Sequence, residues 1–357
     1  MNILFLNCYD PLNPKSGGAE KYTFEIAKRL AKKHNVVWIS EKFSNSASEE
    51  ILENIKILRW GNRLSVLLFA WRYFLKNRNQ IDLVVDQHHG YPFLTPIYIG
   101  KKRSLTIIYE VAGEIWGYQT SRGISFLGRI LERLILSVIY NNRRFITLSS
   151  STKKELEDLG LHNVEIVKPA RIKFVQNYGD KDRNLLVSTT GIRKLKRIED
   201  QIMAVNILVR DFSAIKLKIT GNYEKDYKKQ LDSLINILNL KNNIEFTGFL
   251  SEESKNKLVA KAKLSLATSV KEGWGLALSE SSALGTPVIA YNVVGYRDSI
   301  EDTCGVLTQS NSPEGIALEA KKLLNNDNLY EQYRENCLLR PERTWDEVTV
   351  EFEKLIT

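Results

Sequence analysis

Short apolar runs alternate with segments of helical spacing along the first half of the chain. Residues 2–7 form an apolar run that ends in a Pro/Gly-containing loop, and residues 20–33 then carry Tyr22, Ile26 and Leu30 at helical spacing. The same pattern predicts further strands and helices, with strands at 36–40, 55–60, 82–86, 105–109 and 145–148, and helices at 63–78, 126–140 and 152–159. Because parallel strands need crossovers that bury both faces of a sheet, the alternation predicts a Rossmann-like α/β domain.

The alternation stops at residues 169–182, where charged and turn residues accumulate, and then restarts. The second set of elements consists of strands at 184–189, 215–220, 244–247, 264–268 and 287–290, and helices at 198–209, 227–238, 252–260 and 276–284. The pattern therefore predicts two similar α/β domains, residues 1–170 and residues 171–340, joined by a linker near 169–182. A total of 357 residues agrees with two domains.

The end of the chain is a separate amphipathic segment. Residues 343–356 place Trp345, Val348, Phe352 and Leu355 on one helical face, so this helix must pack against another element. From the pattern alone, the second domain is one possible partner.

Composition and charge narrow the class of protein. The chain is 43% hydrophobic and 26% charged, which excludes disordered, collagen-like and coiled-coil proteins. Its net charge is +9, and the charge lies in the first half: residues 1–170 hold 24 Lys and Arg against 16 Asp and Glu, and the rest hold 27 against 26. A basic half raises two hypotheses, a membrane surface and a nucleic-acid surface.

The segment from Arg63 to Arg78 has the composition of a helix that lies on an anionic membrane, with Trp71 and several leucines beside Arg72 and Lys76. Residues 126–144 have a similar composition. An amphipathic helix packed on the sheet with a solvated basic face explains the same residues. The sequence contains no recognised nucleic-acid module, and its basic residues are interleaved with leucines, so we expect no nucleic-acid partner.

Three dispersed cysteines, Cys8, Cys304 and Cys337, form neither a disulfide framework nor a metal cluster and indicate a reducing compartment. The longest apolar stretches are well below the roughly 18 residues of a spanning helix, and the first residues lack the basic region of a signal peptide. We expect a cytoplasmic protein. A second hypothesis is that it associates peripherally with the inner face of the membrane.

The most informative chemistry lies between Lys271 and Asp298. Glu272 lies in a glycine-rich loop, and Glu280 lies eight residues later inside the following helix. A glycine-flanked loop that leads into a helix offers unpaired backbone N–H groups and the positive end of the helix dipole, which stabilise phosphates. A carboxylate further along that helix can accept hydrogen bonds from ribose hydroxyls. For an isolated pair of glutamates, a surface turn would explain the spacing equally well.

The whole string closely resembles the E-x7-E donor-site motif of the retaining glycosyltransferases of family 4, the glycosyl transferases group 1. It reads Glu272-Gly-Trp-Gly-Leu, then Glu280, then Ala283-Leu-Gly-Thr-Pro-Val and a Tyr291-Asn-x-x-Gly295 turn. The Gly17-Gly18-Ala19-Glu20 loop and the Trp345-containing helix also resemble family features, so the resemblance covers nearly the whole chain. It implies the GT-B fold: α/β, two Rossmann-like domains facing across a cleft, with the C-terminal helix (341–357) crossing back to the N-terminal domain.

The resemblance also implies roles for the motif residues. Glu272 matches the glutamate that lies beside the donor sugar near the anomeric carbon. Whether this glutamate acts as a nucleophile or as an electrostatic stabiliser is disputed for the family, and we expect a stabiliser. Glu280 matches the glutamate that holds the ribose. Gly273, Trp274, Gly275 and Leu276 are expected to direct backbone N–H groups to the sugar and phosphates.

A basic loop follows the first strand of the second domain. The family carries an Arg and a Lys there, which stabilise negative charge on the departing pyrophosphate without a metal. Arg193 and Lys196 are the matching residues, with Lys194 and Arg197 as substitutes, because the spacing between Arg and Lys is shorter here than in the family. A solvated basic loop is the alternative explanation.

On the acceptor side, Gly17 and Gly18 sit where the first strand meets the first helix, and residues without a Cβ let backbone approach a bound ligand closely. We count them among the donor-binding residues. His88 and His89 follow the strand at 82–86, at the sheet edge where ligands bind, and could position or deprotonate an acceptor hydroxyl. An ordinary exposed histidine pair is the alternative. Glu110 and Glu114 follow the next strand and are further candidates on the acceptor side.

The resulting prediction is a metal-independent enzyme without a cofactor. It transfers a hexose, with retention, from a UDP- or GDP-sugar bound by the second domain to a glycan or lipid-linked acceptor bound by the first. The alternatives are a GT-B sugar-nucleotide epimerase or phosphorylase, a basic nucleic-acid-binding protein, and a catalytically silent sugar-nucleotide-binding protein. The E-x7-E string does not favour the first, and the presence of both Glu272 and Glu280 argues against the last.

Overall fold

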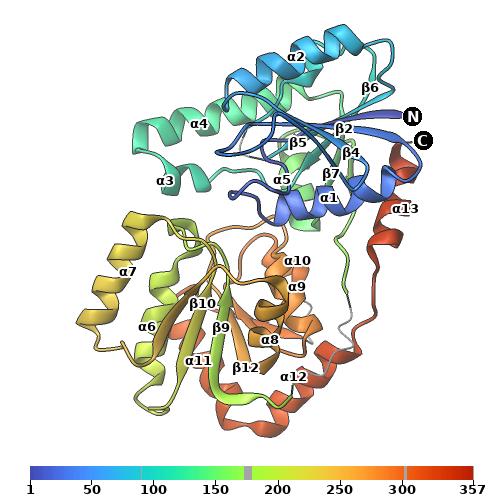
Figure 1. Ribbon diagram of the computed structural model, residues 1–357. Helices are drawn as coiled ribbons and strands as arrows, with labels where there is room; N and C mark the ends of the chain where they lie inside the picture. The colour runs from blue at the N-terminus through green and yellow to red at the C-terminus, as the bar shows by residue number, and fades with distance from the viewer. Residues whose placement is uncertain (90, 173–178, 301–303, 357) are drawn as a thin grey trace. The chain divides into compact units, whose positions relative to one another are not determined.

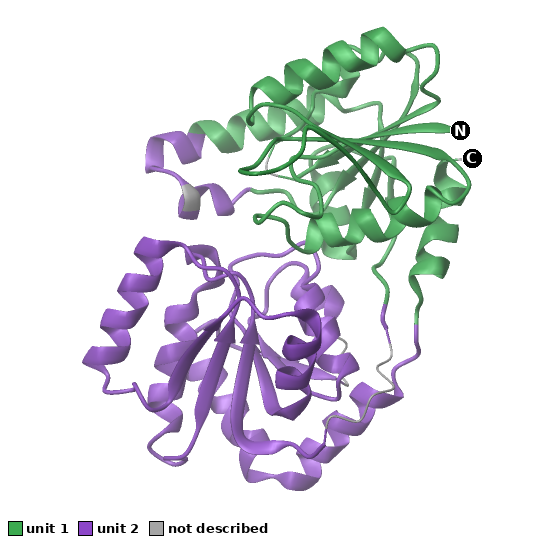
Figure 2. Cartoon of the chain, viewed as in Figure 1, with its two compact units in different colours: residues 1–112, 127–170, 343–357 green, residues 113–126, 171–342 purple. Residues whose placement is uncertain are grey.

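The structure is a computed structural model that describes residues 1–89, 91–172, 179–300 and 304–356. The chain separates into two compact units (Figure 2). Unit 1 comprises residues 1–112, 127–170 and 343–357, and unit 2 comprises residues 113–126 and 171–342. Residues 173–178, in the middle of the predicted linker, lie outside the described residues.

Unit 1 is built on an eight-stranded sheet in the order β3-β4-β2-β1-β5-β6-β7-β8 (Figure 1). Its strands are β1 (Asn2–Leu6), β2 (Asn35–Ser40), β3 (Glu49–Leu52), β4 (Ile55–Arg59), β5 (Leu83–His88), β6 (Arg103–Ile108), β7 (Arg144–Thr147) and β8 (Val164–Ile166). All neighbours pair in parallel except β3 and β4. The pattern does not predict β3 because this edge strand buries none of its side chains fully.

The helices of unit 1 are α1 (Gly18–Leu30), α2 (Ser65–Asn77), α4 (Arg122–Leu134), α5 (Ser150–Asp158) and α13 (Trp345–Ile356); the first residues of α4 group with unit 2. The predicted helix at 126–140 corresponds to most of α4 and the π-helical segment η2 (Ile135–Ile139) that continues it. A short 3-10 turn, η1 (Thr95–Ile97), follows β5.

Helices α2 and α4–η2 cover the same face of the sheet. Val84 on β5 shares a core with Val66 and Ala70 of α2. Asp86, two residues further along β5, accepts a hydrogen bond from the Tyr140 hydroxyl at the end of η2, at 2.5 Å. Alternate residues of a strand point to one face, so both helices lie over that face (Figure 1).

The C-terminal helix α13 packs against α1, which confirms that it returns to the N-terminal unit. Trp345 meets Tyr22 edge-on, with ring centroids 5.8 Å apart. Asp346 accepts a hydrogen bond from Arg29 Nε at 2.6 Å. The apolar face that the sequence predicts is the face that packs, since Trp345, Val348 and Phe352 are all buried.

Unit 2 is built on a six-stranded, fully parallel sheet in the order β11-β10-β9-β12-β13-β14. Its strands are β9 (Asp182–Thr189), β10 (Lys216–Thr220), β11 (Ile244–Gly248), β12 (Ala262–Ala267), β13 (Val288–Ala290) and β14 (Gly305–Leu307). Its helices are α3 (Ile115–Gln119), α6 (Ile198–Leu208), α7 (Lys225–Ile237), α8 (Glu252–Lys261), α9 (Leu276–Ala283), α10 (Tyr296–Ser299), α11 (Pro313–Asn325) and α12 (Asp327–Leu339), with a 3-10 turn η3 (Lys194–Lys196). The prediction of two Rossmann-like sheets is therefore confirmed.

Candidate active site

The strand order of unit 2 changes direction between β9 and β12, because β10 and β11 lie on one side and β13 and β14 on the other. In parallel α/β sheets, ligands bind at the carboxyl ends of the strands where the order reverses. Hydrogen bonds join the two loops that begin there: Val270 N donates to Leu195 O at 2.9 Å, and Thr268 Oγ1 donates to Lys196 O at 2.7 Å. The basic loop and the Glu272 loop, distant in sequence, are thus held side by side.

Glu272 lies at the centre of this reversal point and is held by several donors. Lys196 Nζ forms an ion pair with its Oε1, and Ser269 Oγ donates to the same oxygen at 2.6 Å. The Tyr296 hydroxyl donates to Ser269 Oγ at 3.0 Å and reaches Glu272 Oε1 at 3.5 Å. Burial, and next the Glu272 carboxylate, raise the pKa of Tyr296 well above its usual value, so its hydroxyl remains a donor. The structure therefore brings into contact Glu272 and Lys196, two residues that the sequence assigns to the donor site.

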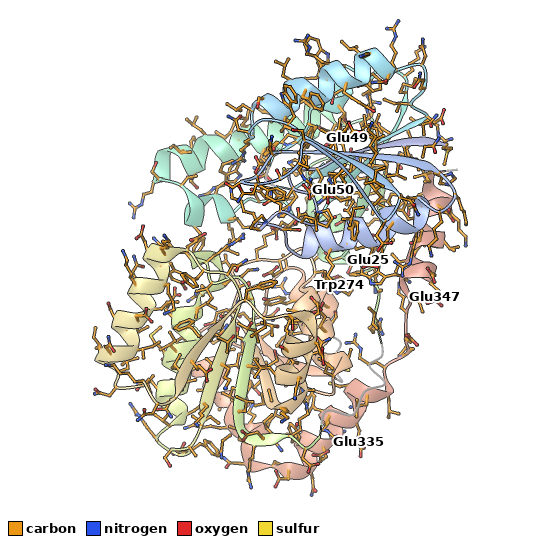
Figure 3. All side chains as sticks on the ribbon, viewed as in Figure 1. Glu25, Glu49, Glu50, Trp274, Glu335 and Glu347 are labelled. Atoms are coloured by element: carbon orange, nitrogen blue, oxygen red, sulfur yellow. The ribbon has the colours of Figure 1, made fainter. Side chains whose placement is uncertain are left out.

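The glycines of the motif allow close backbone packing around Glu272. A Cβ on Gly295 would lie 2.1 Å from the Glu272 carbonyl oxygen, and one on Gly275 would lie 2.7 Å from the Tyr296 ring. Both glycines have positive φ, +81° and +91°, which disfavours other residues. Gly275 is the N-cap of α9, so Leu276 and Ala277 lie in its first turn, where backbone N–H groups have no partner within the helix. Trp274, labelled in Figure 3, is buried.

Glu280 lies in the second turn of α9, half-buried, with Gly273 and Trp274 in the loop before it. Lys255 on α8 donates to its Oε2 at 2.8 Å and also contacts Glu252 at 3.1 Å. The Trp274 indole N–H donates to Ser279 Oγ at 3.0 Å, which fixes the loop to the helix that carries Glu280. The two motif glutamates thus each have a lysine partner.

The remaining cations of the basic loop differ in their surroundings. Arg193 and Lys194 are exposed. Arg197 pairs with Asp200 at 2.7 Å, and its guanidinium lies 5.3 Å from the centroid of the Tyr291 ring. Arg197 is thus engaged within unit 2, whereas Arg193 remains accessible to a ligand.

Unit 1 has a similar reversal of strand order between β1 and β5. The buried Glu20 joins the two loops there: its Oε2 accepts from Gly17 N at 2.8 Å, and its Oε1 lies 2.8 Å from His89 Nδ1. Burial alone would raise the pKa of Glu20, but the attraction of His89 and hydrogen bonds from His89 and Gly17 lower it. Gly17 is the N-cap of α1 and Gly18 its first residue, so the predicted Gly-Gly loop is held by Glu20.

The two adjacent histidines occupy different environments. The ring of His88 lies 6.4 Å from that of Tyr140, and its Nδ1 has no hydrogen-bond partner among the described residues. Burial, and next the charge of His89, lower the pKa of His88 to about 4. His89 points instead toward Glu20, with its side chain 35% exposed. Of the pair, His89 is therefore the one that joins the two loops at the reversal of strand order.

The remaining acceptor-side candidates lie after β6. Glu110 is half-buried just past the end of β6, and Glu114 is exposed at the N-cap of α3. Glu110 groups with unit 1 and Glu114 with unit 2, where α3 lies against η3. Within the described ranges, no group of three or more His, Cys, Asp or Glu residues is placed to hold a metal ion.

Two family models match the chain in succession. The model described as Glycosyltransferase Family 4 matches residues 16–177, and the model described as Glycosyl transferases group 1 matches residues 170–338. The chain belongs to glycosyltransferase family 4. It is a glycosyltransferase of the hexosyltransferase type that takes its sugar from a nucleotide-sugar donor, as the motif predicts.

Curated relatives match at low identity. N-acetyl-alpha-D-glucosaminyl L-malate synthase of Bacillus anthracis is 29% identical over 361 residues, which cover 93% of this chain and 90% of that protein. Alpha-monoglucosyldiacylglycerol synthase of Streptococcus pneumoniae is 23% identical, over 62% of this chain and 56% of that protein.

Solved structures share the fold. Sucrose-phosphate synthase from Thermosynechococcus elongatus superposes with a TM-score of 0.80 at 16% identity, over 99% of this chain and 98% of its own. Anabaena HepE in complex with UDP-glucose gives 0.78 at 16% identity, over 100% of this chain and 99% of its own. WaaG, a glycosyltransferase of lipopolysaccharide biosynthesis, gives 0.78 at 17% identity, over 99% of each chain. The GT-B prediction is confirmed.

Several residues of the site lie outside the sequence prediction. Ser269 and Tyr296 contact Glu272, and their signal was proximity to the motif, three residues before Glu272 and one after Gly295. Lys255 lies on a different helix, and no motif points to it. Glu20 belongs to the Gly-Gly loop in the sequence, and the pattern assigns it no role.

Proposed function

We propose that this glycosyltransferase transfers a hexose from a UDP-sugar, with retention of configuration, to a lipid-linked or glycan acceptor. The single observation that supports the donor site most strongly is the Glu272–Lys196 ion pair at the reversal of strand order. The glycine-containing loop that follows Glu272 leads directly into the N-terminus of α9. Uracil is proposed as the nucleobase of the donor because the structure of HepE contains UDP-glucose. A GDP-sugar is the second candidate donor.

Each residue of this site has a task in the proposed reaction. As the glycosidic bond breaks, negative charge grows on the pyrophosphate, and Lys196, Arg193 and the N–H groups at the start of α9 would stabilise it. Positive charge grows on the anomeric carbon, and the Glu272 carboxylate would stabilise that charge without forming a bond to it. Glu280 would accept hydrogen bonds from the ribose hydroxyls. Cations of the chain replace a metal in this scheme.

In the same proposal, residues 171–340 bind the donor, and residues 1–170, with residues 341–357, bind the acceptor. His89 is the acceptor-side residue, because its Nδ1 is directed to the buried Glu20 and the ring is thereby oriented. A histidine held in this way can position or deprotonate an acceptor hydroxyl. His88 is less suited to this role because its ring nitrogen is enclosed.

A lipid acceptor is supported by the surface of α2. Its buried face consists of Val66, Ala70 and Phe74. A second apolar stripe is exposed on the same helix and consists of Leu64, Leu68, Trp71 and Leu75 at 77%, 51%, 41% and 42% exposure. We call these four residues the α2 stripe. Arg72 and Lys76 flank it, which is the arrangement of a helix that lies on an anionic bilayer.

Helix α4, on the same face of the sheet, also exposes an apolar stripe, formed by Leu127, Ile130, Leu131 and Leu134 next to Arg129 and Arg133. No helix among the described residues is long and apolar enough to cross a membrane. We therefore propose peripheral association with the inner face of the cytoplasmic membrane. The alternative of a single packed amphipathic helix leaves the second stripe of α2 unexplained.

A thermal-unfolding titration with UDP, GDP, ADP, TDP and CDP tests the donor proposal. A ligand that binds only the folded protein stabilises it by about 2.7 kcal/mol at 100 times its Kd. We expect UDP to raise the unfolding midpoint equally with magnesium and with EDTA. A response to GDP alone would change the proposed base, and a response that needs magnesium would contradict the metal-independent scheme. If no diphosphate raises the midpoint, the proposed donor site is wrong.

A further inference from the structure

Three donors converge on one oxygen of Glu272. Lys196 Nζ, Ser269 Oγ and, at longer range, the Tyr296 hydroxyl all reach Oε1. No donor among the described residues is recorded at Oε2. The described residues therefore hold the carboxylate through one oxygen.

The three donors differ in charge, and this difference separates their tasks. Under the proposed function, Lys196 must also stabilise the departing pyrophosphate, so its hold on Glu272 weakens when negative charge grows next to it. Ser269 and Tyr296 are neutral and buried at 1% and 4% exposure, so they do not compete for the phosphate in this way. They can hold Glu272 throughout the reaction.

The two neutral donors form a chain with a fixed direction. Tyr296 donates to Ser269, and Ser269 donates to Glu272, so removal of the tyrosine hydroxyl also affects the serine. The Tyr296 ring lies so close to Gly275 that no Cβ fits between them. The hydroxyl thus has its place fixed by the same packing that forms the start of α9.

We propose that Ser269 and Tyr296 are positioning residues that hold Glu272 by Oε1 and present Oε2 to the donor sugar. The proposal rests on the proposed function, because it assigns Glu272 to the sugar. Without the neutral donors, a glutamate side chain regains rotamer freedom, which costs catalysis and leaves nucleotide binding intact.

The test uses Tyr296→Phe, which keeps the ring, and Ser269→Ala. We expect Tyr296→Phe to lower kcat about fivefold and Ser269→Ala about tenfold, the usual effect of one lost hydrogen bond. The KM for the nucleotide sugar and the Kd for the nucleoside diphosphate should stay within about twofold of the wild-type values, because neither residue is assigned to the nucleotide. Tyr296→Phe should lower kcat less in the Ser269→Ala background than in wild type, since the tyrosine acts mainly through the serine.

Tyr227→Phe is the matched control, because Tyr227 is also buried in unit 2 and its hydroxyl also donates to a carboxylate, that of Glu199. Tyr227→Phe should lose as much thermal stability as Tyr296→Phe, but its kcat should equal that of the wild type. An equal fall of kcat in the control, a change confined to KM, or an unchanged kcat in both test variants would overturn the positioning role.

A failure of the proposed function would look different. If the wild-type protein releases no nucleoside diphosphate from any nucleotide sugar, the donor assignment itself fails. Crystal structures then decide the positioning role: Glu272 must adopt a second rotamer in Ser269→Ala, and a single unchanged rotamer rejects the proposal.

Discussion

The two units share an architecture but use a carboxylate at the reversal point in opposite ways. In unit 1, Glu20 is completely buried, and both of its oxygens are engaged by the loops that it joins. In unit 2, the side chain of Glu272 is 19% exposed and is held through one oxygen. At a reversal of strand order, the protein can thus engage both oxygens of a carboxylate, as in Glu20, or hold it through one oxygen, as in Glu272.

The units also differ in their outer surfaces. Unit 1 carries a larger positive excess than unit 2, 25 Lys and Arg against 19 Asp and Glu compared with 26 against 23, and it exposes the α2 stripe. In unit 2, α6 packs its apolar residues against the core of the sheet. This difference is expected if unit 2 meets a small charged donor and unit 1 meets an acceptor at a lipid surface.

The largest effect should come from the exposed carboxylate. We expect Glu272→Ala to lower kcat about 10²- to 10³-fold, the range for loss of one electrostatic group at a transition state. The Kd for the nucleoside diphosphate should change by less than about threefold, because the glutamate is assigned to the sugar. Product release and isothermal titration measure the two quantities. The control is Glu335→Ala, at an exposed glutamate of α12 labelled in Figure 3. Near-normal turnover of Glu272→Ala would contradict the catalytic role that distinguishes Glu272 from the loop-joining Glu20.

The surface difference is tested with vesicles. We expect the wild-type protein to partition onto phosphatidylglycerol vesicles. The double variant Leu68→Ser/Trp71→Ser should weaken partitioning about tenfold or more, because it removes apolar area that would be buried in the membrane. Flotation at low salt measures the bound fraction. Ile237→Ser is a matched control, because Ile237 ends α7 of unit 2 at 76% exposure. Equal binding to neutral vesicles would contradict the electrostatic part, and no binding to either would leave α2 without its proposed membrane partner.

A smaller effect is expected at the second motif glutamate. Glu280→Ala should raise the Kd for the nucleoside diphosphate about tenfold, as expected for lost hydrogen bonds to the ribose. The variant leaves Lys255 with Glu252 at 3.1 Å, so the lysine keeps an acidic partner. A 2′,3′-dideoxy nucleotide should bind wild type and variant equally. Unchanged affinity for the normal nucleotide would reject the ribose role.

The smallest effect is a pH dependence confined to unit 1. His88 has a pKa near 4 in the folded protein, below its usual 6.5, so its neutral form is favoured by folding. Its contribution to stability is complete above pH 6.5 and is lost as the pH falls toward 4. Between these limits the unfolding midpoint of unit 1 should fall about 5 °C more in wild type than in His88→Gln. His162→Gln, at an exposed histidine of the same unit, is the control and should keep the wild-type slope.

Much of the fold could be predicted from the sequence because apolar periodicity reports burial directly. The predicted helix at 198–209 is α6 at Ile198–Leu208, and the predicted helix at 276–284 is α9 at Leu276–Ala283. The prediction missed the exposed edge strand β3 and the four-residue helix α10. It also missed α11 and α12, although α11 buries Ile316, Ala320 and Leu323 at helical spacing. The N-cap of α5 is Ser149, whose Oγ accepts a hydrogen bond from Thr152 N at 3.2 Å.

The candidate site divides in the same way. The E-x7-E string identified Glu272, Glu280 and the glycines, because a phosphate-binding loop imposes residue types at fixed spacing within one segment. The resemblance favours Arg193 and Lys196 among the four cations of the basic loop, but the contact between Lys196 and Glu272 depends on the strand order of the sheet. Lys255 reaches Glu280 from another helix, which no local pattern encodes.

The sequence by itself determined the family, the two parallel sheets and the pair of motif glutamates, because these depend on residue types and spacings along one stretch of chain. The tertiary structure alone decided which of two adjacent histidines contacts Glu20, which oxygen of Glu272 is engaged, and that α2 has a second, exposed apolar face. The physical reason is that these facts depend on partners brought together across the sheet: Glu20 for His89, Ser269 and Tyr296 for Glu272, and the core of β5 for α2.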